Sequence, residues 1–183
     1  MLTLGVIADT HVPDRARQIH PGVIHVLQKT GAAAILHAGD ICSQEVLEQL
    51  GEFAPVYAVQ GNRDIWRLSH LPMSLSLEFE GVSIGLTHGH GGFLSYFSQK
   101  LSYLVNGYQL IHYQTRLRKA FPGAQVIVFG HTHRSENTWV DDVLIFNPGP
   151  ASNLQWEKTP PSMGLLHILD GGTIRGEIIT LES

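Results

Sequence analysis

Histidine, aspartate and asparagine side chains gather at five points of the chain, each directly after a short apolar stretch. Imidazole and carboxylate groups are ligands of divalent cations, and a site built from them needs no thiolate. One carboxylate has two oxygens and can bridge two cations, while a carboxamide adds a neutral oxygen ligand. The pattern therefore predicts a metal centre assembled from distant segments. The five groups are Asp9 with His11, Asp40, Asn62 with Asp64, His88 with His90, and His131 with His133.

Hydrophobic patterning predicts the elements that position these groups. Two helical stretches, Pro21–Lys29 and a second one ending at Gly51, alternate with the first three strands, which favours parallel pairing with right-handed crossovers. The second half is expected to form antiparallel hairpins. Ligands of open α/β sheets bind beyond the carboxyl ends of the strands, so the five groups are expected to share one crevice. The strands that precede them are expected at Leu2–Ala8, Ala32–His37, Val56–Val59, Val82–Thr87 and Gln125–Phe129.

Composition narrows the class of protein. The 183 residues suit a single domain, 43% of them are hydrophobic and only 15% are charged. The net charge of −4 provides no broad basic surface, which disfavours nucleic acid as a partner. The single cysteine, Cys42, excludes an internal disulfide and fits a reducing compartment. No apolar run is long enough to span a membrane, so a cytoplasmic protein is expected.

Five motifs, taken in order, resemble the calcineurin-like metallophosphoesterase superfamily. The turn Asn147-Pro148-Gly149 and the short chain are similar to its small YfcE-type phosphodiesterase branch, which the Vps29 retromer subunit resembles in fold. The resemblance covers residues 9–149. It implies an α/β fold, a four-layer α-β-β-α sandwich of two mixed sheets flanked by helices. The motifs are Asp9-Thr10-His11, Gly39-Asp40, Gly61-Asn62-Arg63-Asp64, His88-Gly89-His90 and Gly130-His131-Thr132-His133.

The resemblance also implies an activity and a set of ligands. The expected protein is a phosphoesterase with two divalent metal ions, Mn²⁺ in this branch, although Ni²⁺, Co²⁺, Fe²⁺ and Zn²⁺ suit the same donors. A hydroxide bridging the two ions would attack the phosphorus of a small phosphodiester. The implied ligands are Asp9, His11 and His133 for one ion and Asn62, His88 and His131 for the other, with Asp40 bridging; Asn62 and Arg63 would contact the phosphate.

Arg63 departs from the family pattern, in which histidine or cysteine stands at this position. Arginine stays protonated at any useful pH, so it cannot act as a general acid, but it can bind a phosphate through two parallel hydrogen bonds. Diesters with acidic leaving groups are therefore the expected substrates. His90 is a candidate proton donor in its place, and the alternatives are support of the ligands or a surface position. Asp64 is expected to orient a neighbouring group or to cap a helix.

Two questions stay open at the level of sequence. Residues 93–120, rich in aromatic side chains, predict a helical insertion that packs on its own sheet, closes over the site or joins two copies of the chain. The chain could also be a non-catalytic Vps29-like scaffold that binds a protein partner. Because all seven ligand positions carry competent side chains, the enzyme is the preferred interpretation. A nuclease is disfavoured by the net charge.

Overall fold

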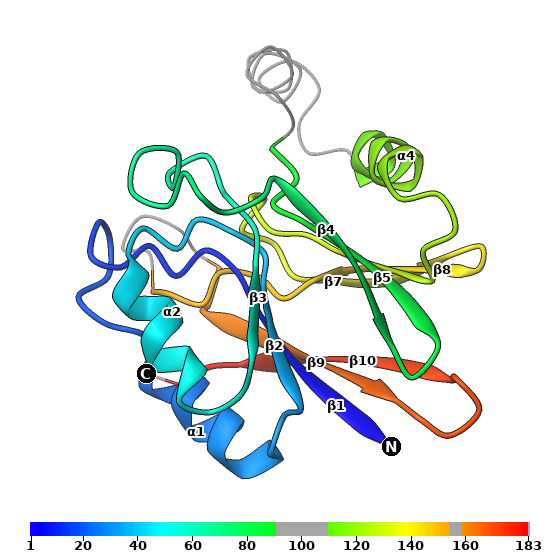
Figure 1. Ribbon diagram of the computed structural model, residues 1–183, viewed down its shortest axis with the longest axis horizontal. Coiled ribbons are helices and arrows are strands. Elements are labelled where there is room, and N and C mark those ends of the chain that lie inside the picture. Colours follow the sequence, from blue (N-terminus) through cyan, green and yellow to red (C-terminus); the bar gives the residue numbers. More distant parts are fainter. Residues whose placement is uncertain (91–109, 154–158, 183) are drawn as a thin grey trace.

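The computed structural model describes residues 1–90, 110–153 and 159–182, and these residues form a pair of five-stranded sheets that pack face to face (Figure 1). The first sheet, called sheet 1, has the strand order β10-β9-β1-β2-β3. Strands β1, β2 and β3 are parallel, whereas β9 pairs antiparallel with both β1 and β10. The strands of sheet 1 are β1 (Leu2–Ile7), β2 (Ala34–His37), β3 (Val56–Ala58), β9 (Ser162–Ile168) and β10 (Ile174–Thr180).

The second sheet, called sheet 2, has the order β4-β5-β6-β8-β7. Its three central strands, β5, β6 and β8, are parallel, and an antiparallel hairpin partner closes each edge. The expectation of antiparallel pairing in the second half therefore holds for the hairpins and for β9 beside β1, whereas β5, β6 and β8 pair in parallel. The strands of sheet 2 are β4 (Ser74–Phe79), β5 (Val82–Thr87), β6 (Val126–Val128), β7 (Glu136–Val140) and β8 (Val143–Asn147).

Helices cover the outer faces of both sheets. α1 (Pro21–Thr30) and α2 (Gln44–Gly51) pack on sheet 1, and α4 (Leu110–Ala120) packs on sheet 2 (Figure 1). Three apolar clusters of described residues fill the spaces between the layers, and one of them lies between the two sheets, with Val6 and Leu36 from sheet 1 and Val128 and Phe146 from sheet 2. The predicted four-layer α-β-β-α sandwich is thus confirmed.

Local sequence accounts for the ends of α1. Pro21 occupies its first turn, where a missing N–H costs nothing, and Gly31 ends it in the left-handed conformation at φ 58°. Of the helical insertion expected over 93–120, the structure describes only the segment from residue 110. Most of the residues that would close over the site or join two copies lie outside the described residues. Among the helices described, none combines the length and the apolar composition needed to cross a bilayer.

Candidate metal centre

The loops that follow five strands meet at one end of the sandwich. Backbone hydrogen bonds join them: the amide of Asp9 donates to the carbonyl of Gly39 at 3.0 Å, and the amide of Gly130 donates to the carbonyl of His88 at 3.2 Å. β1, β2 and β3 deliver their loops from sheet 1, whereas β5 and β6 deliver theirs from sheet 2. The convergence expected from the sequence is therefore observed, and it brings all seven implied ligands together.

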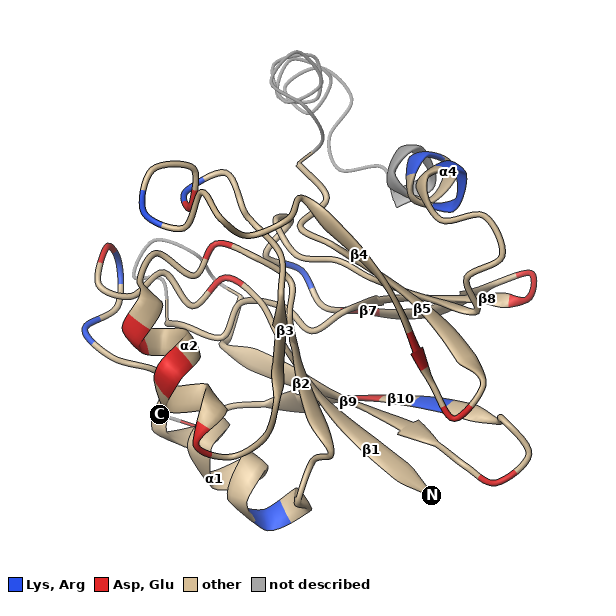
Figure 2. Cartoon of the chain, in the orientation of Figure 1, with Lys and Arg blue, Asp and Glu red and all other residues tan. Residues whose placement is uncertain are grey.

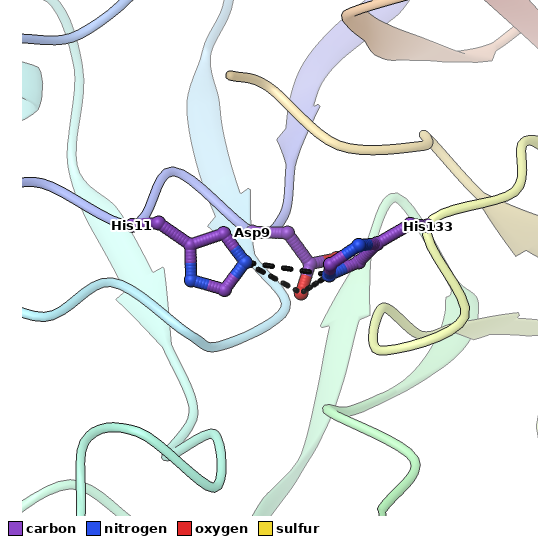
Figure 3. Close-up of side chains that lie close together, drawn as sticks. All are labelled: Asp9, His11 and His133. Atoms are coloured by element: carbon purple, nitrogen blue, oxygen red, sulfur yellow. Dashed lines mark hydrogen bonds and ion pairs between the residues drawn. The ribbon is translucent and has the colours of Figure 1, made fainter. Parts of the chain in front are cut away.

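The residues expected to hold the first ion, Asp9, His11 and His133, lie together and are called the first ligand set (Figure 3). The Nε2 atom of His133 lies 3.4 Å from Oδ1 of Asp9, and Nε2 of His11 lies 3.9 Å from the same oxygen. The two Nε2 atoms are 3.3 Å apart. Two imidazole nitrogens and a carboxylate oxygen thus point at one small volume, which is the arrangement that a cation requires.

The residues expected to hold the second ion, Asn62, His88 and His131, also lie together and are called the second ligand set. The Oδ1 atom of Asn62 lies 3.1 Å from Nε2 of His88 and 3.1 Å from Nδ1 of His131. The other nitrogen of His88, Nδ1, lies 2.7 Å from the carbonyl oxygen of Ala38 and so must donate to it. This bond orients the ring and turns Nε2 toward Asn62 and Asp40, the direction in which a metal-binding nitrogen must point.

Asp40 lies between the two sets. Its Oδ1 is 3.4 Å from Nε2 of His88 in the second set, and its Oδ2 is 3.9 Å from Nδ1 of His11 in the first. The ligand atoms of Asp9, Asp40 and His88 also lie within 4.8 Å of one another. The carboxylate of Asp40 is therefore in reach of both sets, as a bridging ligand must be.

Burial and protonation state make the donor set suitable for a cation. Asp9, His11 and His88 are fully buried, and Oδ1 of Asp9 accepts no hydrogen bond within the described stretches of the chain. Burial lowers the pKa of His11 to about 3, so its ring is neutral near pH 7 and has a lone pair to offer. Burial alone would raise the pKa of Asp9, but attraction from His133 and its neighbours holds it well below the ordinary range. A buried anionic oxygen beside the neutral ring of His11 fits a divalent metal ion.

The backbone of the site is strained. Five of the seven implied ligands have positive φ angles, a region that costs a non-glycine residue of order 1–3 kcal/mol. Such strain persists only where the surrounding fold enforces it, and it gathers at functional sites. The φ angles are 54° for Asp9, 52° for His11, 53° for Asp40, 70° for His131 and 52° for His133.

Arg63 and His90 lie beside the ligand sets in different environments. The Nε atom of Arg63 is 3.9 Å from Oδ2 of Asp40, and one third of its side chain is exposed, so it lies at the mouth of the site. His90 is only 6% exposed, and its ring centre lies 5.3 Å from that of His88. Burial lowers the pKa of His90 to about 4. This neutral, enclosed ring favours support of the ligands over proton donation.

Asp64 organises the loops beneath the site, in agreement with its expected orienting role. Its Oδ1 accepts hydrogen bonds from the amides of Ile41 and Cys42 at 3.0 and 2.8 Å, and its Oδ2 accepts one from Gly61 at 2.8 Å. The carboxylate thus ties the loop that carries Asp40 to the loop that carries Asn62.

Two further contacts support the backbone of the site, and only one of them has a signal in the sequence. The hydroxyl of Ser152 donates to the carbonyl of Asp9 at 3.0 Å, and Nδ2 of Asn147 donates to the carbonyl of Gly130 at 3.0 Å. Asn147 lies in a recognisable turn, which is a signal that could have identified it. Ser152 has no comparable signal, because its contact is formed with a residue at the other end of the chain.

Comparison with known proteins agrees with this geometry. A profile of the calcineurin-like phosphoesterase superfamily domain matches residues 2–171, and the chain therefore belongs to that superfamily. It is 36% identical over 178 residues to a probable metallophosphoesterase of Methanothermobacter thermautotrophicus, covering 97% of this chain and 92% of the relative. It is 24% identical to a phosphodiesterase of Methanocaldococcus jannaschii, covering 81% of this chain and 83% of the relative.

The fold has solved counterparts as well. Vacuolar Protein Sorting 29 from Cryptosporidium parvum superimposes with a TM-score of 0.69 and 22% identity, over 100% of this chain and 98% of that one. The expected membership of a metallophosphoesterase branch with a Vps29-like fold is thus confirmed.

Proposed function

We propose that the chain is a metal-dependent phosphodiesterase, formed as one domain over residues 1–183 with a helical insertion at about 93–120. The observation that carries the proposal is the pair of adjacent ligand sets joined by Asp40. One relative is named a phosphodiesterase and another a probable metallophosphoesterase, which supports an activity on phosphoesters. The free, buried thiol of Cys42 is consistent with a cytoplasmic location.

Two divalent ions are proposed to bind the two ligand sets, with Mn²⁺ as the first candidate. Oxygen and imidazole donors also suit Ni²⁺, Co²⁺, Fe²⁺ and Zn²⁺, so supply in the cell selects among them. When bound, such ions stabilise charge on the phosphoryl oxygens and activate water as a nucleophile. The proposed ligands are Asp9, His11 and His133 for the first ion, Asn62, His88 and His131 for the second, and Asp40 for both.

Arg63 is proposed to bind the phosphate of the substrate together with Asn62. Its guanidinium lies at the solvent side of Asp40 and presents a planar fork of donors that matches two phosphate oxygens. Because arginine cannot release a proton to the leaving group, the reaction should favour diesters whose leaving group departs as a stable anion. A small, activated phosphodiester is therefore the expected substrate.

The test is a metal titration with three substrates. Protein stripped with a chelator is reloaded with Mn²⁺ and assayed with bis(p-nitrophenyl) phosphate, p-nitrophenyl phosphate and single-stranded DNA. We expect turnover of the diester only in the loaded protein, at a rate above those of the monoester and the DNA. A protein that serves only as a binding scaffold would turn over none of them, and a nuclease would prefer the DNA.

A pair of variants makes the test specific to the site. Asp9→Asn removes the charge of the first ligand set and should lower the rate at least about a hundredfold. Asp142→Asn makes the same chemical change at a side chain that is 90% exposed on the β7–β8 turn, and should leave the rate unchanged. Equal rates for the two variants would contradict the proposal.

A further inference from the structure

Two arginines and one aspartate form a cluster at the mouth of the candidate metal centre. Asp14 lies in the loop after β1, and Arg63 and Arg67 lie in the loop after β3. The Nη1 atom of Arg67 donates to Oδ1 of Asp14 at 2.6 Å and to the carbonyl of Cys42 at 3.3 Å. The Nη1 atom of Arg63 lies 3.8 Å from the other oxygen of Asp14. One carboxylate is thus shared between two guanidinium groups.

The charge of this cluster is opposite to that of the whole chain. The molecule carries a net charge of −4, yet within the cluster one carboxylate, Asp14, faces two arginines. The other carboxylate near Arg63, Asp40, is the proposed bridging ligand of the metal ions. Asp64, which shares the loop after β3 with both arginines, is buried and accepts three backbone amides. Basic segments occur on both loops (Figure 2). An excess of positive charge beside the site attracts an anion.

Arg67 is arranged to bind an anion from solvent. Its side chain is 54% exposed, although Asp14 fixes one of its nitrogens. The hydrogen bond from Arg67 to Asp14 raises the pKa of Arg67, so the group stays charged. A guanidinium has five N–H donors, and its fork suits a phosphate or a carboxylate. Within the described residues, Arg67 contacts Asp14 and Cys42 through Nη1, so its other donors can reach a second anionic group.

The cluster is also connected to the place where the reacting phosphate is proposed to bind. Arg63 lies between Asp14 and the ligand sets, since its Nη1 is 3.8 Å from Oδ2 of Asp14 and its Nε is 3.9 Å from Oδ2 of Asp40. Because Arg63 and Arg67 contact the same carboxylate, an anion bound by Arg67 would lie close to a phosphate bound by Arg63. Such a separation is within the size of a small metabolite.

We infer that Arg67, held by Asp14 beside Arg63, forms an anion subsite that binds a second phosphate or carboxylate group of the substrate. The substrate class is then a phosphodiester that carries an additional negative charge near the reacting phosphorus. The inference rests on the proposed function for its reaction, but binding to the subsite can be measured without turnover.

The experiment compares two substrates that differ in one phosphate. The p-nitrophenyl ester of thymidine 5′-phosphate is assayed beside the same ester with an added 3′-phosphate, using Mn²⁺-loaded protein. We expect the added phosphate to raise kcat/KM about tenfold, chiefly through a lower KM. The advantage should shrink as the salt concentration rises, because the subsite is partly exposed.

Variants locate the effect. Arg67→Ala should reduce the ratio of the two kcat/KM values to about one, and Arg67→Lys should restore some of it because the charge returns. Arg175→Ala is the matched control, because Arg175 is an exposed arginine on β10. It lies level with Thr3 near the start of β1, whereas the site follows the end of β1. This variant should keep the full ratio.

Two outcomes overturn the inference. One is an equal kcat/KM for both substrates in the unmodified protein. The other is an equal loss on both substrates in Arg67→Ala, which would mean that Arg67 only holds Asp14 in place.

Calorimetry measures the affinities of thymidine 3′,5′-bisphosphate and thymidine 5′-phosphate without any turnover. This measurement tests the subsite independently of the proposed function. If neither ester is hydrolysed, the proposed function fails. The inference then stands when the bisphosphate binds about tenfold more tightly, and falls when the two affinities are equal.

Discussion

Asp40 packs directly against the backbone of Gly61. A Cβ atom at position 61 would overlap with the backbone nitrogen and Oδ1 of Asp40, so only glycine allows this approach. The contact brings the loop after β2 against the loop after β3, and the amide of Arg63 then donates to Oδ1 of Asp40 at 2.9 Å. The proposed bridging ligand therefore depends on a residue that carries no side chain.

Gly61→Ala is expected to displace Asp40 and to weaken metal binding at least about tenfold. The forced separation should also lower the free energy of unfolding by about 1–3 kcal/mol. Calorimetric titration with Mn²⁺ and urea unfolding measure the two effects. Gly51→Ala, in α2 with no atom near the added methyl group, is the control and should stabilise the protein by about 0.5–1 kcal/mol. Unchanged metal affinity in Gly61→Ala would contradict the proposed bridging role of Asp40.

Asp64→Ala is expected to destabilise the protein by at least about 3 kcal/mol. The substitution leaves three backbone amides, those of Ile41, Cys42 and Gly61, without their buried acceptor. Asp64→Asn keeps one oxygen acceptor and should cost less. Urea unfolding of the metal-free proteins measures the difference, and a loss below about 1 kcal/mol in Asp64→Ala would show that these bonds contribute little.

Metal removal is expected to lower the stability of the protein. A ligand that binds only the folded chain stabilises it by about 2.7 kcal/mol at a hundredfold excess over Kd. Thermal unfolding with Mn²⁺ and with a chelator should therefore give two clearly separated midpoints. Asp9→Asn should abolish most of this separation, because its buried Oδ1 belongs to the first ligand set. An equal separation in the variant would exclude Asp9 as a ligand.

The metal-free protein should begin to lose stability at about pH 6.5, well above the pH at which ordinary carboxylates take up protons. Burial lowers the pKa of His11 and His131 to about 3, and that of His37 to about 4, from 6.5. As the pH falls below 6.5 the unfolded chain binds protons first, so stability present above pH 6.5 is lost progressively down to pH 3–4. Each group contributes up to about 1.4 kcal/mol per pH unit.

Urea unfolding between pH 7 and pH 5 in the presence of a chelator measures this slope. His37→Gln removes a buried imidazole outside the ligand sets. It should make the free energy of unfolding less dependent on pH, by the contribution of one histidine. His70→Gln changes an exposed histidine and should leave it unaltered. A free energy of unfolding that does not change between pH 7 and pH 5 would contradict the buried, neutral state of these rings.

The sequence was sufficient to predict those site residues that directly follow a buried, apolar strand. Asp9 and His131 follow apolar strands, and parallel pairing brings such strand ends together, so their convergence required no knowledge of the loops. The ion pair of Asp14 and Arg67 was not predictable, because it depends on the paths of two irregular loops. The pairing of β8 with β6 was also hidden, since hairpin patterning identifies β7 as one neighbour of β8 but not the other.

Each ligand set draws its members from both sheets. The first combines Asp9 and His11, beyond β1, with His133, beyond β6, and the second combines Asn62, beyond β3, with two histidines from the opposite sheet. Sliding of one sheet over the other would pull both sets apart at once. The apolar side chains sandwiched between the sheets consequently keep the two ligand sets aligned, and we expect repacking of Val128 or Phe146 to weaken metal binding as well as to lower the stability.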